Sequence, residues 1–159
     1  MVVYSNYQRL IKLAEETFAM HEDLDQLQVD QAVRERLIKI HPATLSEFSD
    51  ENGPVAWLLL IPTTKTLMER FLTKEITEKE LYEMTPLDIE YDAIYLCSGL
   101  VLPEYQRKGI IQGMALKAIE KIRINHPIQF LFNWAFTEGG DRAAERLSEL
   151  TGLPLLKRS

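Results

Sequence analysis

The sequence contains a single cysteine, Cys97, among 159 residues. One thiol cannot form an internal disulfide, which excludes a disulfide-stabilised secreted scaffold and predicts a reducing, cytoplasmic location. Long hydrophobic runs are also missing, and the longest, Val55 to Ile61, is far too short to span a bilayer. The first ten residues do not combine a basic start with an apolar stretch, so no secretory signal is expected. Without repeats or Gly/Ser/Pro-rich linkers, the sequence predicts one domain over residues 1–159.

The sequence has fewer basic than acidic residues, with 18 lysines and arginines and 24 aspartates and glutamates, which gives a net charge of −6. This balance argues against nucleic acid or an anionic membrane as the main partner. The charge is unevenly distributed, because residues 1–90 carry a net charge of −8 and residues 91–159 a net charge of +2. An acidic half suits a cationic ligand. Acidic surface helices explain the same asymmetry, and on charge alone they are the preferred interpretation.

The hydrophobic fraction of 46% is enough for a core, and the patterning predicts a mixed α/β fold. Capping residues and helical periodicity predict helices from Ser5 and from near Asp30. A turn at residues 50–53 joins two predicted strands, and the second should end at Pro62 because proline has no N–H for a sheet. The other predicted elements are two short helices within 63–90, a strand over 93–102, an amphipathic helix from Gln106, a strand over 128–136 and a helix over 141–151.

The most informative segment lies between the strand over 93–102 and the long helix that follows it. The first N–H groups of a helix have no intrahelical partners and attract anions. Arg107 and Lys108 add two positive charges at this position, although cations there oppose the helix dipole. Gly109 has no Cβ that would block a phosphate, and Pro103 removes a main-chain donor from the strand. The segment therefore predicts an anion-binding loop beside a sheet that splays open.

The run Val101-Leu102-Pro103, followed by Gln106-Arg107-Lys108-Gly109, resembles the signature of the GNAT superfamily, the acyl-CoA-dependent N-acyltransferases. The resemblance implies a central mixed, mostly antiparallel sheet that is flanked by helices and splayed at its central strands, with residues 63–90 as a helical insert. It implies that the main chain of Leu100, Val101 and Leu102 pairs with the pantetheine arm of coenzyme A. The residues expected to hold the pyrophosphate end are Gln106, Arg107, Lys108, Gly109, Ile110 and Ile111. Ile111 departs from the family, which usually has glycine or alanine there.

A second region, residues 135–153, is similar to the family's other cofactor-contacting segment. Asp141 stands in place of a frequent asparagine, and Ser148 in place of a tyrosine that often protonates the leaving thiolate. Tyr95 stands where some members carry a glutamate base, although a packed aromatic is the preferred interpretation of this residue. Asn133 fits a hydrogen bond to pantetheine and a hydrogen bond within the sheet equally well. Cys97 is expected to be a small core residue rather than a nucleophile.

The resemblance implies an N-acyltransferase that uses acetyl-CoA as cosubstrate. A primary amine of a small molecule or peptide, cationic amines among them, would attack the thioester directly. Two alternatives remain open: a non-catalytic CoA-binding or regulatory module on the same fold, and a protein–protein adaptor that keeps the fold without the cofactor. Neither nucleic acid nor a membrane is an expected partner, and a homodimer is compatible with the sequence. The histidines His21, His41 and His126 lack metal-like spacing, so no metal site is expected.

Overall fold

The fold is that of a computed structural model, which describes residues 4–20, 30–135 and 137–159, with the backbone alone for residues 17–20. The described strands form one five-stranded sheet in the order β1-β2-β3-β4-β5. The strands are β1 (Leu45–Asp50), β2 (Gly53–Thr63), β3 (Ala93–Val101), β4 (Phe130–Asn133) and β5 (Leu155–Lys157). The first two neighbouring pairs are antiparallel and the last two are parallel, so the sheet is mixed. There are two antiparallel and two parallel strand pairs, and the antiparallel pairs are the longer ones.

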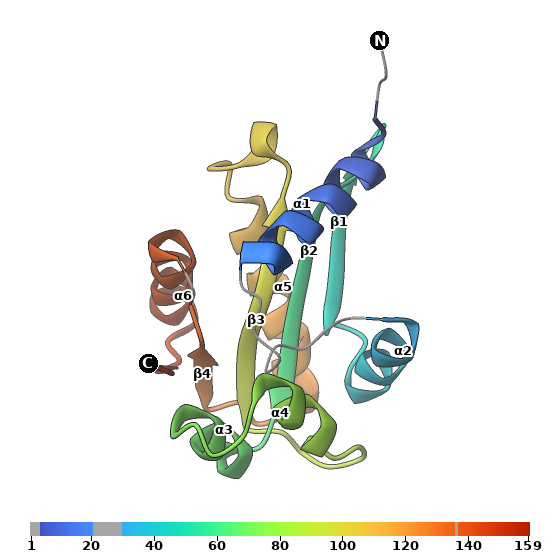
Figure 1. Cartoon of the computed structure of the whole chain (residues 1–159). Coiled ribbons are helices and arrows are strands. Elements are labelled where there is room, and N and C mark those ends of the chain that lie inside the picture. The colour runs from blue at the N-terminus through green and yellow to red at the C-terminus, as the bar shows by residue number, and fades with distance from the viewer. Residues whose placement is uncertain (1–3, 21–29, 136) are drawn as a thin grey trace.

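Helices flank this sheet on both faces (Figure 1). The helices are α1 (Asn6–Met20), α2 (Gln31–Ile40), α3 (Lys65–Leu72), α4 (Glu78–Met84), α5 (Ile110–Asn125) and α6 (Glu138–Thr151), with a short 3-10 turn, η1, at Pro103–Tyr105. In the view of Figure 1, α1, α3 and α4 lie in front of the sheet and α5 lies behind it. Among the described residues, no helix is long and apolar enough to cross a membrane.

The helix starts predicted at Ser5 and near Asp30, and the predicted hairpin turn, are confirmed by the structure. The main-chain N–H of Gln8 donates to the Ser5 hydroxyl, and the Ser5 N–H donates to the Gln8 side chain. Asp30 caps α2, and Thr77 caps α4 with the reciprocal bond from its own N–H to the third residue of the helix. The turn between β1 and β2 is closed by Gly53, whose φ of 115° is a conformation that favours glycine. Local sequence therefore places these elements.

Two predicted boundaries differ from the structure. β2 continues through Pro62 to Thr63, and Pro62 lies opposite Ile94 of β3. β1 pairs no further along β2 than Leu59, so β2 has only one neighbouring strand at Pro62, a position that tolerates a residue without an N–H. The long helix begins at Ile110 rather than at Gln106, because left-handed backbone conformations just before it cannot belong to a helix.

The strand predicted over 128–136 is also shorter in the structure, where it is β4. β4 ends at Asn133, whereas the prediction ran to Phe136, which lies outside the described residues. The helix α6 begins three residues earlier than predicted, capped by the Thr137 hydroxyl, and ends as predicted at Gly152, whose φ is 73°.

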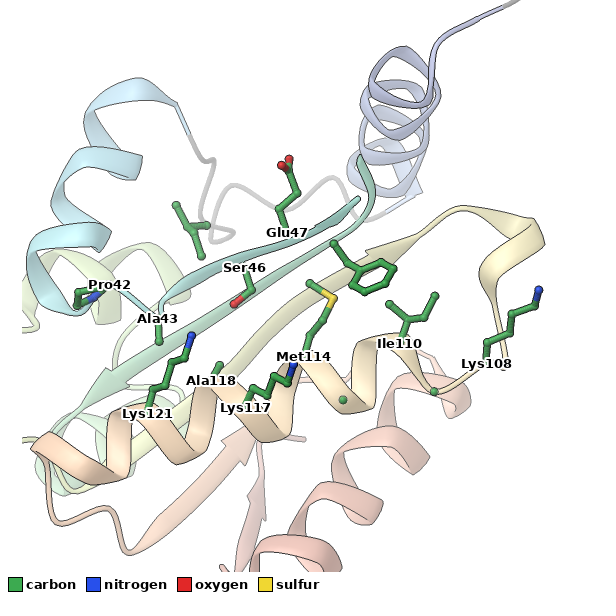
Figure 2. Close-up of a pocket in the computed structure, with 14 residues that line it drawn as sticks. Pro42, Ala43, Ser46, Glu47, Lys108, Ile110, Met114, Lys117, Ala118 and Lys121 are labelled. Carbon is green, nitrogen blue, oxygen red and sulfur yellow. The ribbon is translucent and has the colours of Figure 1, made fainter. Parts of the chain in front are cut away.

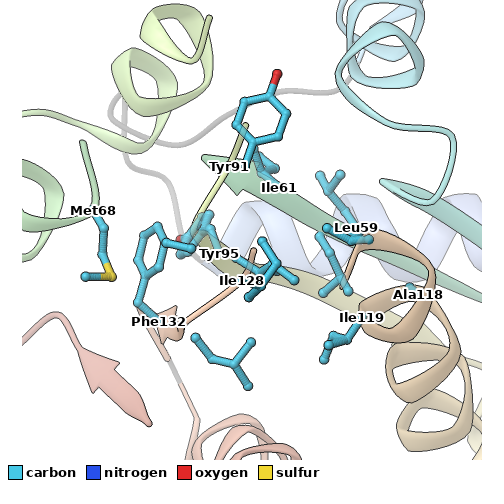
Figure 3. Close-up of a cluster of buried hydrophobic side chains, with 14 of the residues drawn as sticks. Leu59, Ile61, Met68, Tyr91, Tyr95, Ala118, Ile119, Ile128 and Phe132 are labelled. Atoms are coloured by element: carbon cyan, nitrogen blue, oxygen red, sulfur yellow. The ribbon is translucent and has the colours of Figure 1, made fainter. Parts of the chain in front are cut away.

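The main core lies between the sheet and the helices on either side. Aromatic rings on three elements meet near its centre: Phe71 of α3, Tyr95 of β3 and Phe132 of β4 are all fully buried. The Tyr95 and Phe132 rings stack with centroids 5.1 Å apart, and the Phe71 ring meets Tyr95 edge-on at 5.0 Å. Figure 3 shows Tyr95 and Phe132 side by side in this cluster. The packing fixes the sheet at the point where β3 and β4 begin to separate.

Candidate functional site

The candidate site is a slot between β3 and β4. β4 pairs only with Ala93–Leu96 of β3, and β3 then continues to Val101 with no strand on that side in the described part of the chain. A cavity of about 440 Å³ opens there. At about 3.3 Å per residue, the unpaired stretch of β3 is about 16 Å long. We call this cavity the β3–β4 slot. Its length and its free main-chain edge fit an extended ligand better than a compact one.

A β-bulge helps to open the slot. Leu59 of β2 lies opposite Ser98, and Leu60 lies opposite Leu96, so Cys97 is an extra residue in β3. A bulge bends its strand and increases the local twist, which carries the rest of β3 away from β4. Ser98 and Gly99, the next two residues, are exposed to the slot. The opening therefore begins at the bulge.

The loop from Gln106 to Gly109 closes the outer end of β3 and leads into α5. Arg107 has a φ of 64° and Gly109 a φ of 75°. A left-handed residue that is not glycine costs about 1–2 kcal/mol, so Arg107 holds local strain. In the described residues, no main-chain N–H between Arg107 and Gln112 donates to another group, and the first helical bond runs from Gly113 to Gly109. Free N–H groups beside alternating backbone conformations form a concavity that suits an anion.

The role of Gly109 differs in detail from the prediction. A Cβ at this position would meet no protein atom within 4 Å. The positive φ, rather than close packing within the chain, is what favours glycine here.

Behind the inner end of the slot lies a buried carboxylate, Glu78, on α4. The residue is 6% exposed, and its Oε2 accepts a hydrogen bond from the Tyr95 hydroxyl at 2.6 Å. Burial, followed by neighbouring groups that include Glu78, raises the pKa of Tyr95 well above its usual range, so Tyr95 remains a donor at neutral pH. Burial of a carboxylate is costly unless it is paired, and such groups gather at functional sites.

Cys97 connects this buried pair to the slot, since it lines the cavity and interacts with Glu78. Its apolar surroundings raise the pKa of its thiol, and the charge of Glu78 raises it further. A thiol held protonated is a poor nucleophile, which agrees with the prediction that Cys97 is not a catalytic nucleophile.

Two more polar side chains lie at this end of the slot. Asn133 lines the cavity, is 3% exposed, and has an Oδ1 atom that accepts no hydrogen bond from the described residues. The Arg158 guanidinium lies 4.5 Å from the Phe71 ring and 4.4 Å from the Trp134 ring. Its main-chain N–H donates to the Asn133 carbonyl at 2.9 Å. A buried acceptor without a donor is uncommon, and it suits a ligand that carries an N–H or O–H.

The structure brings some of the predicted site residues together at the slot. The predicted residues that line it are Leu100, Val101, Gln106, Ile111 and Asn133. The Ile111 side chain lies over Gly99, where a Cβ would come within 3.3 Å of it, so Ile111 narrows the cavity. Arg107 is exposed in the loop. Leu102 is buried, and its N–H donates to the Val55 carbonyl of β2 rather than facing the slot.

The remaining predicted residues lie elsewhere. Lys108, Gly109 and Ile110 line a second groove, on the side of α5 that faces β1. Asp141 accepts a hydrogen bond from Lys157 at 3.0 Å and does not line the slot. The Ser148 hydroxyl donates to the Leu153 carbonyl at 2.6 Å, beyond the end of α6. Tyr95 is a packed, buried aromatic residue, as preferred in the sequence analysis, and its hydroxyl also donates to the Glu78 carboxyl group.

The described residues contain no group of three or more His, Cys, Asp or Glu side chains that could hold a metal ion. His41 and His126 lie with ring centroids 5.8 Å apart, and the His41 Nε2 atom is 2.9 Å from the Asn125 Oδ1 atom. His21 lies outside the described residues.

The chain was compared with protein-family models, curated proteins and solved structures. None of the three gives a match.

The slot is therefore interpreted from its own geometry, and that geometry adds two residues that sequence reasoning missed. Glu78 was counted only as part of a helical insert, directly after the capping residue Thr77. Arg158 follows the last strand and was not considered. A signal for Glu78 was present, because it is the residue of α4 that precedes Leu81 by three positions and shares its buried face.

Proposed function

We propose that the protein is an acyltransferase that transfers an acetyl group from acetyl-CoA to a primary amine. The observation that carries the proposal is the order of three features along β3: the unpaired N–H groups of residues 107–112 beyond its outer end, its free edge at residues 97–101, and the buried Tyr95–Glu78 pair at its inner end. An anionic pyrophosphate suits the unpaired N–H groups, an amide-containing arm suits the free strand edge, and an ammonium group suits the buried carboxyl group.

The cofactor would lie along β3. The Leu102 N–H donates to Val55 of β2, and main-chain groups of a strand alternate in direction, so those of Gly99 and Val101 face the open slot. There the amides of a pantetheine arm can form hydrogen bonds in place of a strand. Asn133 Oδ1 is placed to accept one more of these bonds. The thioester would then lie near Cys97, where β3 and β4 separate, and main-chain N–H groups at the bulge would polarise its carbonyl.

The acceptor must lose a proton before it attacks. Glu78 is the nearest buried carboxylate, and Tyr95 holds it in position. In the proposed reaction the ammonium group of the acceptor gives one proton to Glu78, and Glu78 passes that proton to solvent. The amine nitrogen of the acceptor then attacks the thioester carbon. The C–S bond breaks as the amide forms, and the second nitrogen proton goes to the leaving thiolate. A carboxyl group in this position favours a cationic amine, in agreement with the acidic N-terminal half of the chain.

A second candidate function is a CoA-binding module without catalysis. It is favoured by Ser148, whose hydroxyl is engaged with the Leu153 carbonyl and does not line the slot, so that no side chain in the predicted position can protonate the thiolate.

Titration calorimetry with CoA, together with thiol release from acetyl-CoA in the presence of an amine panel, tests both candidates. The acyltransferase predicts binding and amine-dependent thiol release, whereas the module predicts binding alone. Arg107→Ala with Lys108→Ala should weaken binding about tenfold, equivalent to about 1.4 kcal/mol. Lys39→Ala with Lys79→Ala removes two exposed charges elsewhere and should leave binding unchanged. An absence of binding at millimolar CoA would reject both functions.

A further inference from the structure

A groove of about 500 Å³ lies between the outer edge of β1 and helix α5 (Figure 2). It shares no lining residue with the β3–β4 slot. Figure 2 shows Ala43 and Lys121 at one end of the groove and Ile110 and Lys108 at the other. We call it the β1–α5 groove. The proposed acyl transfer meets this groove at the loop alone, because Lys108, Gly109 and Ile110 line the groove, while Glu78, Tyr95 and the free edge of β3 lie elsewhere.

Three lysines line this groove in a chain whose net charge is −6: Lys108, Lys117 and Lys121. All three are exposed, and none forms an ion pair with another described residue. Lys117 and Lys121 are one turn apart on α5, where like charges weaken a helix. Glu47 points away from them in Figure 2, and its carboxylate accepts a hydrogen bond from the Trp57 indole at 2.8 Å. The groove is therefore locally positive and unneutralised within the described chain.

The β1 side of the groove offers free main-chain groups. β1 is the first strand of the sheet, with no strand on its outer side among the described residues. The Leu60 N–H donates to the Thr44 carbonyl at 2.9 Å. Main-chain groups of an antiparallel strand alternate in direction, so those of Leu45 and Glu47 face the open edge. These two residues can pair with an added strand without disturbing β2.

The groove also has an apolar end. Phe48 is 46% exposed, which is unusual for a phenylalanine, and it lines the groove together with Ile110 and Met114. The apolar end lies toward Lys108, and the end with Lys117 and Lys121 is charged (Figure 2).

We infer that the β1–α5 groove binds an extended acidic segment of a partner protein, which adds to β1 as an outer strand. Alternate side chains of a strand are about 6.6 Å apart, and Lys117 and Lys121 are separated by about 6 Å along the helix axis. Two acidic residues at alternate positions therefore match the two lysines. Apolar residues at the preceding alternate positions would cover Phe48 and Met114, while the main chain pairs with Leu45 and Glu47.

A second copy of this chain suits the groove less well. Pairing of two β1 edges about a two-fold axis would bring two sets of the same three lysines together, and like charges at an interface are unfavourable.

The test uses a fluorescein-labelled ten-residue peptide in which two valines and then two glutamates occupy alternate positions, with threonine between them. Fluorescence anisotropy should show saturable binding to the full chain. Lys117→Glu with Lys121→Glu should weaken binding at least tenfold, whereas Lys39→Glu with Lys79→Glu, the same charge change at exposed sites elsewhere, should weaken it less than threefold.

A matched pair of variants separates strand addition from simple charge attraction. Glu47→Pro and Glu47→Gln both remove one negative charge, but only proline removes the outward N–H. Strand addition predicts at least a tenfold loss for Glu47→Pro and no loss for Glu47→Gln. Circular dichroism checks that each variant is folded. A peptide N-methylated at its central residues should bind at least tenfold less tightly to the unaltered chain, which keeps the test valid if Glu47→Pro does not fold.

Three results would overturn the inference. The first is an absence of saturable binding, and the second is equal binding of the methylated peptide. The third is a dimer in sedimentation that excludes the peptide and that the lysine changes do not alter. CoA binding at the β3–β4 slot is measured separately, so this inference and the proposed acyl transfer can fail independently.

Discussion

The hydrogen bond between Tyr95 and Glu78 makes a prediction that can be worked through quantitatively. Both side chains are buried, and the Tyr95 hydroxyl lies 2.6 Å from the Glu78 carboxylate. A hydrogen bond to a charged group is worth about 1.5–3 kcal/mol, and its removal leaves a buried carboxylate with one donor fewer. Tyr95→Phe should therefore destabilise the protein by about 2 kcal/mol. For a chain of this length the melting temperature should fall by roughly 4–8 °C.

A double-mutant cycle isolates this interaction from the loss of packing. Tyr95→Phe, Glu78→Gln and the double variant are compared by urea unfolding, with Tyr82→Phe as the matched control because Tyr82 is also buried on α4. The double variant should be more stable than the sum of the single changes predicts, by at least about 1 kcal/mol. Additive effects within about 0.3 kcal/mol would refute the claim that Tyr95 holds Glu78 in position.

Three other predictions concern the loop, the thiol and the slot. Gly109→Ala should destabilise the protein by about 1–2 kcal/mol because residue 109 has a positive φ, whereas Arg107→Gly should destabilise it by no more than about 1 kcal/mol. A larger loss of stability for Arg107→Gly than for Gly109→Ala in urea unfolding would contradict the loop geometry. The pKa of Cys97 is raised in the folded state, so as the pH rises the thiol ionises first in the unfolded state, and the free energy of unfolding should fall above about pH 8.5. Cys97→Ala should reduce this fall between about pH 8.5 and 10. An unchanged dependence of the free energy of unfolding on pH would contradict the prediction. Gly99→Val should place a branched side chain in the slot and abolish CoA binding measured by calorimetry, while Ser98→Ala should not, and equal binding by both variants would show that the slot is not used.

Local signals in the sequence were sufficient for most of the elements. The capping residues Ser5, Asp30 and Thr77 mark helix starts because each satisfies an N–H group that the helix leaves unpaired. Short apolar runs marked the strands, and the His126-Pro127 step ended α5 as predicted. These effects act over a few residues, so the sequence displays them directly.

The boundaries that failed depend on neighbours that are distant in sequence. Pro62 stays within β2 because β1 has already ended beside it. Met84 follows Leu81 by three positions, a spacing that predicts a shared inner face of α4, but it is 42% exposed because the helix ends there and the chain turns at Thr85. No local pattern reveals either circumstance.

The candidate site divides in the same way. The loop around Arg107 and Gly109 was predicted from residue types alone, and the structure adds the left-handed conformations that leave its N–H groups free. Glu78 was not predicted, because its burial depends on how the helices between β2 and β3 fold back over Tyr95. A carboxylate 17 residues before its partner leaves no spacing signal in the sequence.

A crystal structure of the protein with coenzyme A tests the central claim most directly. The account predicts the pyrophosphate against the main-chain N–H groups of residues 107–112, and the pantetheine arm along Ser98–Leu100 with its thiol near Cys97. Coenzyme A bound away from the β3–β4 slot, or a slot that remains empty at saturating ligand, would contradict it.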